Sequence, residues 1–137
     1  MNSKASKIVS LPKIFDPRGS LSFFENSNQI PFDIKRTYWI YDVPGGESRG
    51  SHAFKESHEF IVALAGSFDV ILNDGTGEIK YSLNRSYYGL YIPNMLWRRM
   101  ENFSTNSLAL VVSSVPYDDL DYIRDFEEFK MVRNGKN

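Results

Sequence analysis

The sequence has 137 residues, of which 42% are hydrophobic and 24% are charged, and these proportions are typical of one globular domain spanning residues 1–137. The net charge of −1 offers no basic surface for nucleic acid or an anionic membrane, and the absence of cysteine excludes disulfides and thiolate chemistry. No long apolar run marks the N-terminus, so we expect neither a signal peptide nor a membrane span, and we expect a cytoplasmic protein.

Turn-forming sequences recur at short intervals along the chain, and short segments rich in Ile, Val, Tyr and Phe lie between them. This spacing is typical of an all-β sandwich or barrel. The predicted strands cover residues 21–25, 35–43, 60–64, 67–72, 79–83, 90–92 and 108–113. The turn at Asn73, Asp74 and Gly75 is expected to join two of these strands in a hairpin.

The pattern changes near the C-terminus. Asp118 and Asp119 can cap a helix, and Tyr122, Phe126 and Phe129 follow at helical spacing. This spacing predicts one amphipathic helix over residues 119–131, with its apolar face on the β structure. The predicted fold class is therefore all-β with a short C-terminal helix.

Residues 49–66 carry the pattern that is most informative about chemistry. The first motif of cupin proteins is a Gly, then His-x-His, three or four residues, Glu, six residues and Gly. His52 opens such a motif here, Glu59 and Gly66 follow at the expected spacing, and Phe54 stands where the second His would be. The segment therefore resembles a cupin motif that has lost one histidine.

The second cupin motif is matched more loosely, by Gly89, Pro93 and Asn102. Its metal-binding His is missing, and Trp97 and Arg98 occupy that neighbourhood. A typical metallocupin offers its metal about three His and one carboxylate, whereas two protein ligands rarely hold a transition metal firmly. We therefore expect no metal and no other cofactor.

Another histidine could replace the missing ligand only if it faced the same side as Glu59. His58 directly precedes Glu59, and neighbouring side chains on a strand point to opposite faces. The sequence therefore gives no good substitute for the lost metal ligands, and a metal-dependent cupin oxygenase is disfavoured.

Several longer segments give a more specific resemblance. They are residues 18–21, 30–38, 49–53, 89–92, 97–98, 102–104 and 121–124, together with Tyr117. Over nearly the whole chain the sequence resembles the dTDP-4-keto-6-deoxyglucose 3,4-ketoisomerases, which are metal-free cupins of the WxcM-like C-terminal domain type. The resemblance implies a cupin-type jelly-roll barrel of antiparallel strands.

The resemblance also implies an activity. Members of this family move the keto group of a dTDP-linked 6-deoxysugar between C4 and C3, and the product serves cell-surface glycans such as O-antigen. His52 occupies the position of the catalytic base, and Tyr38 matches a position that can donate or relay a proton at the developing oxyanion. A homodimer is implied as well, with exchange of N-terminal strands around residues 8–11 as one arrangement.

A dTDP-sugar requires cations for its diphosphate and a planar surface for its base. The expected substrate-binding residues lie in or beside the matched segments, and they are Arg18, Arg36, Arg49, Trp97, Arg98 and Glu59. For Trp97 two interpretations stay open, stacking on the thymine or sugar and packing in the core.

Two positions depart from the family pattern, and they keep other functions open. Phe54 stands where many members have His, and Glu59 stands where Gln is common. Because Phe cannot transfer a proton, one alternative is a non-catalytic or weakly catalytic protein that binds a nucleotide sugar. A related dTDP-sugar epimerase is the other, but its His–Asp dyad has no evident counterpart, since His52 has no obvious Asp partner.

Overall fold

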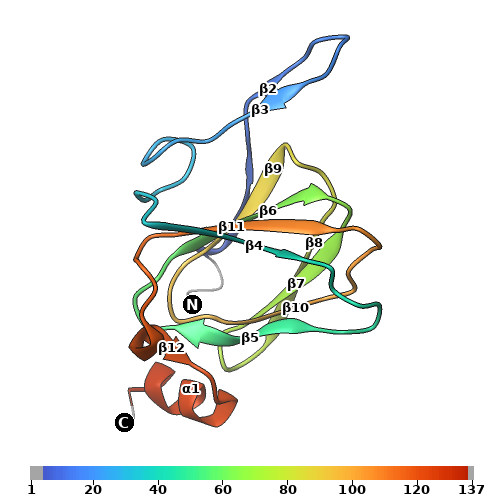
Figure 1. Cartoon of the computed structure of the whole chain (residues 1–137). Helices are drawn as coiled ribbons and strands as arrows, with labels where there is room; N and C mark the ends of the chain where they lie inside the picture. The colour runs from blue at the N-terminus through green and yellow to red at the C-terminus, as the bar shows by residue number, and fades with distance from the viewer. Residues whose placement is uncertain (1–4, 136–137) are drawn as a thin grey trace.

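In the computed structural model, which describes residues 5–135, two five-stranded antiparallel sheets pack against each other (Figure 1). The first sheet has the order β1 (Lys7–Ser10), β9 (Tyr88–Ile92), β6 (Glu59–Ala65), β11 (Leu108–Ser113) and β4 (Arg36–Tyr41). The second has the order β12 (Tyr122–Ile123), β5 (Arg49–Phe54), β10 (Trp97–Glu101), β7 (Phe68–Asn73) and β8 (Glu78–Leu83).

The core lies between the two sheets, because each sheet turns an apolar face towards the other. Ile61 and Val111 come from the first sheet, and Val70, Leu72 and Met100 come from the second, and all of them are buried in one cluster. Burying a side chain of this size contributes about 1.5–3 kcal/mol. This layer therefore supplies much of the free energy that holds the sheets together.

The structure confirms the all-β class and the short C-terminal helix. Each strand predicted from the sequence overlaps an observed strand. The sequence did not predict β5 or β10, because β5 contains Gly50 and Ser51, and β10 contains Arg98 and Arg99, which are weak strand signals on their own. In the described part of the chain the two sheets stay separate and do not join into one closed sheet.

The predicted helix over residues 119–131 is wrong in its first half. Residues Asp119–Asp121 form the short 3₁₀ helix η2, and the next two residues form β12, which pairs with β5. The α-helix α1 spans Phe126–Arg133 and begins after Asp125, whose side chain accepts a hydrogen bond from the Glu128 amide. No helix within residues 5–135 is long and apolar enough to cross a membrane.

A two-stranded arm projects from the body of the molecule, as Figure 1 shows. It consists of β2 (Lys13–Ile14) and β3 (Leu21–Ser22), which pair only with each other. Its apolar side chains are largely uncovered, because Ile14 is 54%, Phe15 77% and Leu21 55% exposed. Nothing in the described part of the same chain buries this arm.

We expect Gly89→Ala to destabilise the fold, because β9 leaves no room for a methyl group at this position. An added Cβ would meet the ring of Phe60 and would lie 2.7 Å from the Ile61 carbonyl oxygen. Forcing an atom into such a site costs about 1–3 kcal/mol of unfolding free energy, which urea denaturation measures. Gly77→Ala is the control, since nothing lies within 4 Å of its Cβ. Equal urea midpoints for the two variants would contradict this packing.

Candidate active site

A cavity of about 560 Å³ opens between the two sheets. Strands β4, β5, β6, β10 and β11 line it, and residues 117–124 form its outer wall. This volume is in the usual range for a small-molecule site. The register of β5 and β10 places His52 opposite Arg98, so the two side chains share the face that looks into the cavity.

The His52 ring packs against two aromatic rings, which also contact each other. Its centroid is 4.7 Å from that of Phe54 and 5.1 Å from that of Tyr122. Burial lowers the pKa of His52 to about 3, and the nearby charges of Arg98, Arg124 and Arg36 add to that effect. Its Nε2 is buried and has no hydrogen-bond partner in the protein. At neutral pH His52 is therefore an uncharged imidazole with a ring nitrogen free for a ligand.

The Glu59 carboxylate is the hub of the polar network, and only 1% of its side chain is exposed. It accepts hydrogen bonds from Arg98 Nη1 at 2.6 Å, the Tyr38 hydroxyl at 2.9 Å and the Ser113 hydroxyl at 2.5 Å. Burial, and then the neighbouring carboxylate, raise the pKa of Tyr38 above its usual value. Tyr38 therefore stays a neutral hydroxyl whose proton is directed at Glu59.

Four arginines line the cavity, namely Arg36, Arg49, Arg98 and Arg124. Arg49 is exposed, and 59% of the Arg124 side chain is exposed, whereas Arg36 and Arg98 are 16% and 2% exposed. Glu59 is the acidic residue among the cavity-lining side chains of the described chain. The excess of guanidinium groups over carboxylate favours an anionic ligand.

The structure brings most of the sequence-predicted site residues together. His52, Tyr38, Arg36, Arg49, Glu59 and Arg98 all line the cavity. Arg18 does not, because it lies in the turn of the β2–β3 arm, where its side chain is 90% exposed and pairs with Asp16. The sequence could not show this, since the arm projects away from the strands that form the cavity.

Trp97 also lies outside the cavity. Successive side chains on β10 point to opposite faces, so Arg98 enters the cavity while Trp97 faces helix α1. The Trp97 ring packs 5.4 Å from Phe126 and 5.9 Å from Phe129, measured between centroids. Of the two interpretations left open for this residue, the structure places it in the packing of the helix.

Sequence reasoning missed three residues of the outer wall, which are Tyr117, Tyr122 and Arg124. The Arg124 guanidinium lies 4.1 Å from the centroid of the Tyr122 ring. All three belong to the segments that carry the family resemblance, but the helix predicted over residues 119–131 includes Tyr122 and Arg124. The family resemblance could have identified these residues as part of the site, whereas the helical spacing of the segment pointed to a helix.

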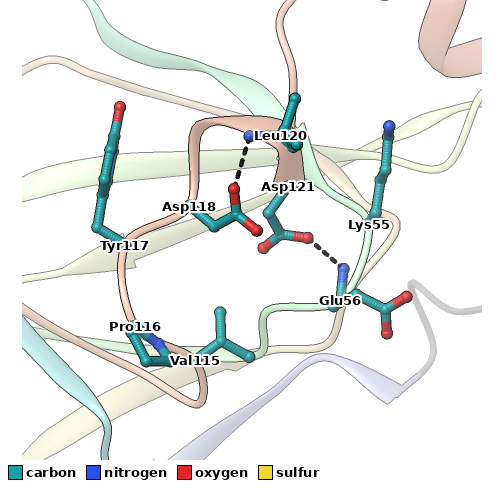
Figure 2. A pocket seen from close by; sticks show the side chains of 8 residues that line it. All are labelled: Lys55, Glu56, Val115, Pro116, Tyr117, Asp118, Leu120 and Asp121. Carbon is teal, nitrogen blue, oxygen red and sulfur yellow. Dashed lines mark hydrogen bonds between the residues drawn. The ribbon is translucent and has the colours of Figure 1, made fainter.

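Asp121 attaches this wall to the turn after β5. Its buried carboxylate accepts hydrogen bonds from the backbone amides of Glu56 at 2.7 Å and Ser57 at 3.2 Å. Figure 2 shows the first of these bonds beside a second, smaller pocket of about 430 Å³, whose rim includes Tyr117. Tyr117 therefore stands between this pocket and the main cavity.

Within residues 5–135 no group of three or more His, Cys, Asp or Glu side chains is arranged to hold a metal ion. Those that line the cavity are His52 and Glu59, and the Glu59 oxygens are already engaged by Tyr38, Arg98 and Ser113. The metal-free site stays a prediction.

Two antiparallel sheets around a basic cavity with a half-buried histidine define a cupin-type protein. The chain belongs to the FdtA family, described as WxcM-like, C-terminal, whose model matches residues 4–134. A TDP-4-oxo-6-deoxy-alpha-D-glucose-3,4-oxoisomerase from Aneurinibacillus thermoaerophilus is 42% identical over 91% of this chain and 90% of its own length.

Solved structures agree with this assignment. A 3,4-ketoisomerase from Helicobacter canadensis is 42% identical, with a TM-score of 0.92 over 94% of this chain and 97% of its own. A mutant of the 3,4-ketoisomerase QdtA from Thermoanaerobacterium thermosaccharolyticum, solved with TDP-4-keto-6-deoxyglucose, is 33% identical. Its TM-score is also 0.92, over 95% of this chain and 94% of its own.

We expect the His52 ring to stay uncharged from pH 8 down to pH 5, because its pKa is lowered to about 3. The unfolded chain takes up this proton near pH 6.5, so His52 also makes the fold less stable as pH falls from there towards 3. The sequence has two histidines, so NMR of ¹⁵N-labelled imidazoles is simple to assign with a His58→Asn variant. A His52 midpoint near 6.5 would refute this electrostatic description.

Proposed function

We propose that this protein is an isomerase that moves the keto group of a TDP-linked 4-keto-6-deoxyhexose from C4 to C3. The observation that carries the proposal is the neutral His52, whose free Nε2 lies in a cavity lined by arginines. The family assignment and the named activities of the relatives support it.

The reaction needs one base and no redox partner. His52 takes the proton from C3, the C3–H electron pair forms a C3=C4 double bond, and the C4 oxygen becomes negatively charged. The C4 oxygen then gains a proton, the C3 hydroxyl loses one and becomes the carbonyl, and His52 returns a proton to C4. An imidazole that is uncharged at neutral pH is able to begin this sequence.

The arginines nearest to solvent are the natural partners of the diphosphate. Arg49 and Arg124 lie at the exposed edge of the cavity, and Arg36 lies deeper on β4. A guanidinium donates two parallel hydrogen bonds to a phosphate, and several convergent guanidiniums bind a diphosphate well. This arrangement supports a diphosphate at the mouth of the cavity and a sugar beside His52.

Tyr117 replaces Trp97 as the proposed stacking surface for the thymine. Its side chain lies at the rim of the cavity and is 61% exposed, so one face is available to a planar base. We keep the cytoplasm as the proposed location, supported by the absence of cysteine, and cell-surface glycans as the proposed use of the product.

Incubation with TDP-4-keto-6-deoxyglucose tests the function directly. NMR of the mixture should show the 3-keto isomer with the unchanged protein and almost none with His52→Asn. The same variant should bind TDP with nearly unchanged affinity by calorimetry, because the base acts on the transition state and not on the diphosphate. Turnover that survives His52→Asn would exclude His52 as the base. TDP binding without turnover by the unchanged protein would favour the binding-protein alternative.

We also propose that the protein forms a homodimer in which a second copy of the chain covers the β2–β3 arm. The arm exposes Ile14, Phe15 and Leu21, and within the described part of one copy its strands pair with no other strand. In such a dimer the arm also carries Arg18 onto the partner. This accounts for a predicted substrate contact that the cavity of the same copy does not provide.

We expect the protein to sediment as a dimer and the double variant F15S/L21S to sediment as a monomer. Both substitutions remove apolar area that only a second copy would bury. Leu120→Ser is the matched control, because Leu120 is 79% exposed on η2, a different element. A monomeric unchanged protein, or a dimer that survives F15S/L21S, would exclude the arm as the interface.

A further inference from the structure

We propose that Arg98 is the catalytic residue that stabilises the negative charge on the sugar oxygen during enolisation, and that Glu59 and Phe54 position its guanidinium. This inference rests on the proposed function. It assigns a second chemical role in the cavity, separate from that of the arginines that bind the diphosphate.

The first observation is that the Arg98 guanidinium is buried and only partly satisfied. Nη1 donates to Glu59 at 2.6 Å, whereas Nε and Nη2 are buried and have no partner in the protein. Buried donors are nearly always hydrogen-bonded, because an unmade bond costs about 1–3 kcal/mol. Donors left free in a ligand cavity are therefore ready for an acceptor that the ligand supplies.

The second observation is the position of these donors relative to the base. Arg98 on β10 is paired directly with His52 on β5, and both line the cavity. The unpartnered Nε2 of His52 and the unpartnered donors of Arg98 therefore belong to neighbouring side chains. A sugar that presents its C3 proton to His52 brings the adjacent C4 oxygen near Arg98.

The third observation separates Arg98 from the diphosphate. Glu59 offsets the charge of Arg98, so this pair attracts a distant dianion less than the exposed Arg49 and Arg124 do. The Tyr38 hydroxyl is not an equal candidate for the oxyanion, because its proton is already directed at Glu59. Arg36 also leaves a buried Nε without a partner, but Arg98 is the arginine that stands opposite His52 in the strand register.

Phe54 gains a function from this arrangement. The Arg98 guanidinium lies 4.9 Å from the centroid of the Phe54 ring, so the ring supports the cation on one side while Glu59 holds it at one end. A histidine at position 54 could transfer a proton, whereas the phenylalanine cannot. Its ring supports the guanidinium of Arg98 instead. The missing histidine and the buried arginine are parts of one arrangement.

The test compares Arg98→Lys with Arg99→Lys, its neighbour on the opposite face of β10. Arg99 pairs with Glu78 and Glu101 and does not line the cavity. Lysine keeps the charge at position 98 but loses the fork of N–H groups. We expect kcat to fall about 10²–10³-fold in Arg98→Lys, the usual effect of losing an oxyanion donor, with nearly unchanged TDP affinity. Arg99→Lys should keep both.

The opposite pattern of effects on kcat and on TDP affinity would overturn the proposal. If Arg98 binds the diphosphate, Arg98→Lys weakens TDP binding and leaves kcat almost intact. If Arg98→Lys does not fold, the Glu59→Gln variant is used as the test instead. The glutamine keeps a hydrogen-bond partner for Tyr38 and removes the negative charge that holds the guanidinium of Arg98. For Glu59→Gln we expect a lower kcat with unchanged TDP affinity. In a separate experiment, addition of guanidinium ion should restore part of the activity of Arg98→Ala. An unchanged kcat in Glu59→Gln would overturn the role of Glu59.

Solvent deuterium separates this inference from the proposed function. The unchanged protein in D₂O should exchange the C3 proton of the substrate, and Arg98→Lys should lose that exchange together with isomerisation, because both need the same charged intermediate. No exchange and no product with the unchanged protein would refute the proposed function and this inference together. Full exchange in Arg98→Lys would refute the inference alone.

Discussion

The carboxylate of Glu59 is almost completely removed from solvent at the start of β6, and the organisation of the cavity depends on how it is satisfied. Its partners come from both sheets, Tyr38 and Ser113 from the first and Arg98 from the second. Removing one partner of a buried ion pair typically costs about 3–5 kcal/mol, because the other charge is left unpaired. The ion pair with Arg98 therefore ties the sheets together beside the cavity.

The same arginines that favour an anionic ligand also make it hard for His52 to hold a proton. Arg98, Arg124 and Arg36 each lower the pKa of the imidazole, in addition to the larger effect of burial. An anion bound to Arg36 and Arg124 offsets their charge and raises the proton affinity of His52. A base that is weak in the empty cavity thus becomes stronger when a diphosphate is present.

Local patterns were enough to predict the class of fold, and the family resemblance supplied most of the cavity residues. Alternating apolar residues marked the central strands, and the spacing from His52 to Glu59 located the polar centre. The sequence could not show that Trp97 faces away from its neighbour Arg98, because β10 lacks a clear apolar alternation. Helical spacing also misassigned Tyr122, since two residues in a short strand carry almost no periodicity. The sequence also could not show that Arg18 lies outside the cavity of its own copy, because the direction of a projecting arm is not a local property.

The attachment of the outer wall through Asp121 uses only the backbone of the turn that receives it. The amides of Glu56 and Ser57 supply the hydrogen bonds, and the backbone amide of Lys55 donates to the carbonyl of Asp121. Every residue except proline offers the same amide. The exposed side chains of this turn, Lys55 and Glu56, can therefore change while the wall stays in place, whereas a single proline in the turn would remove one of its attachments.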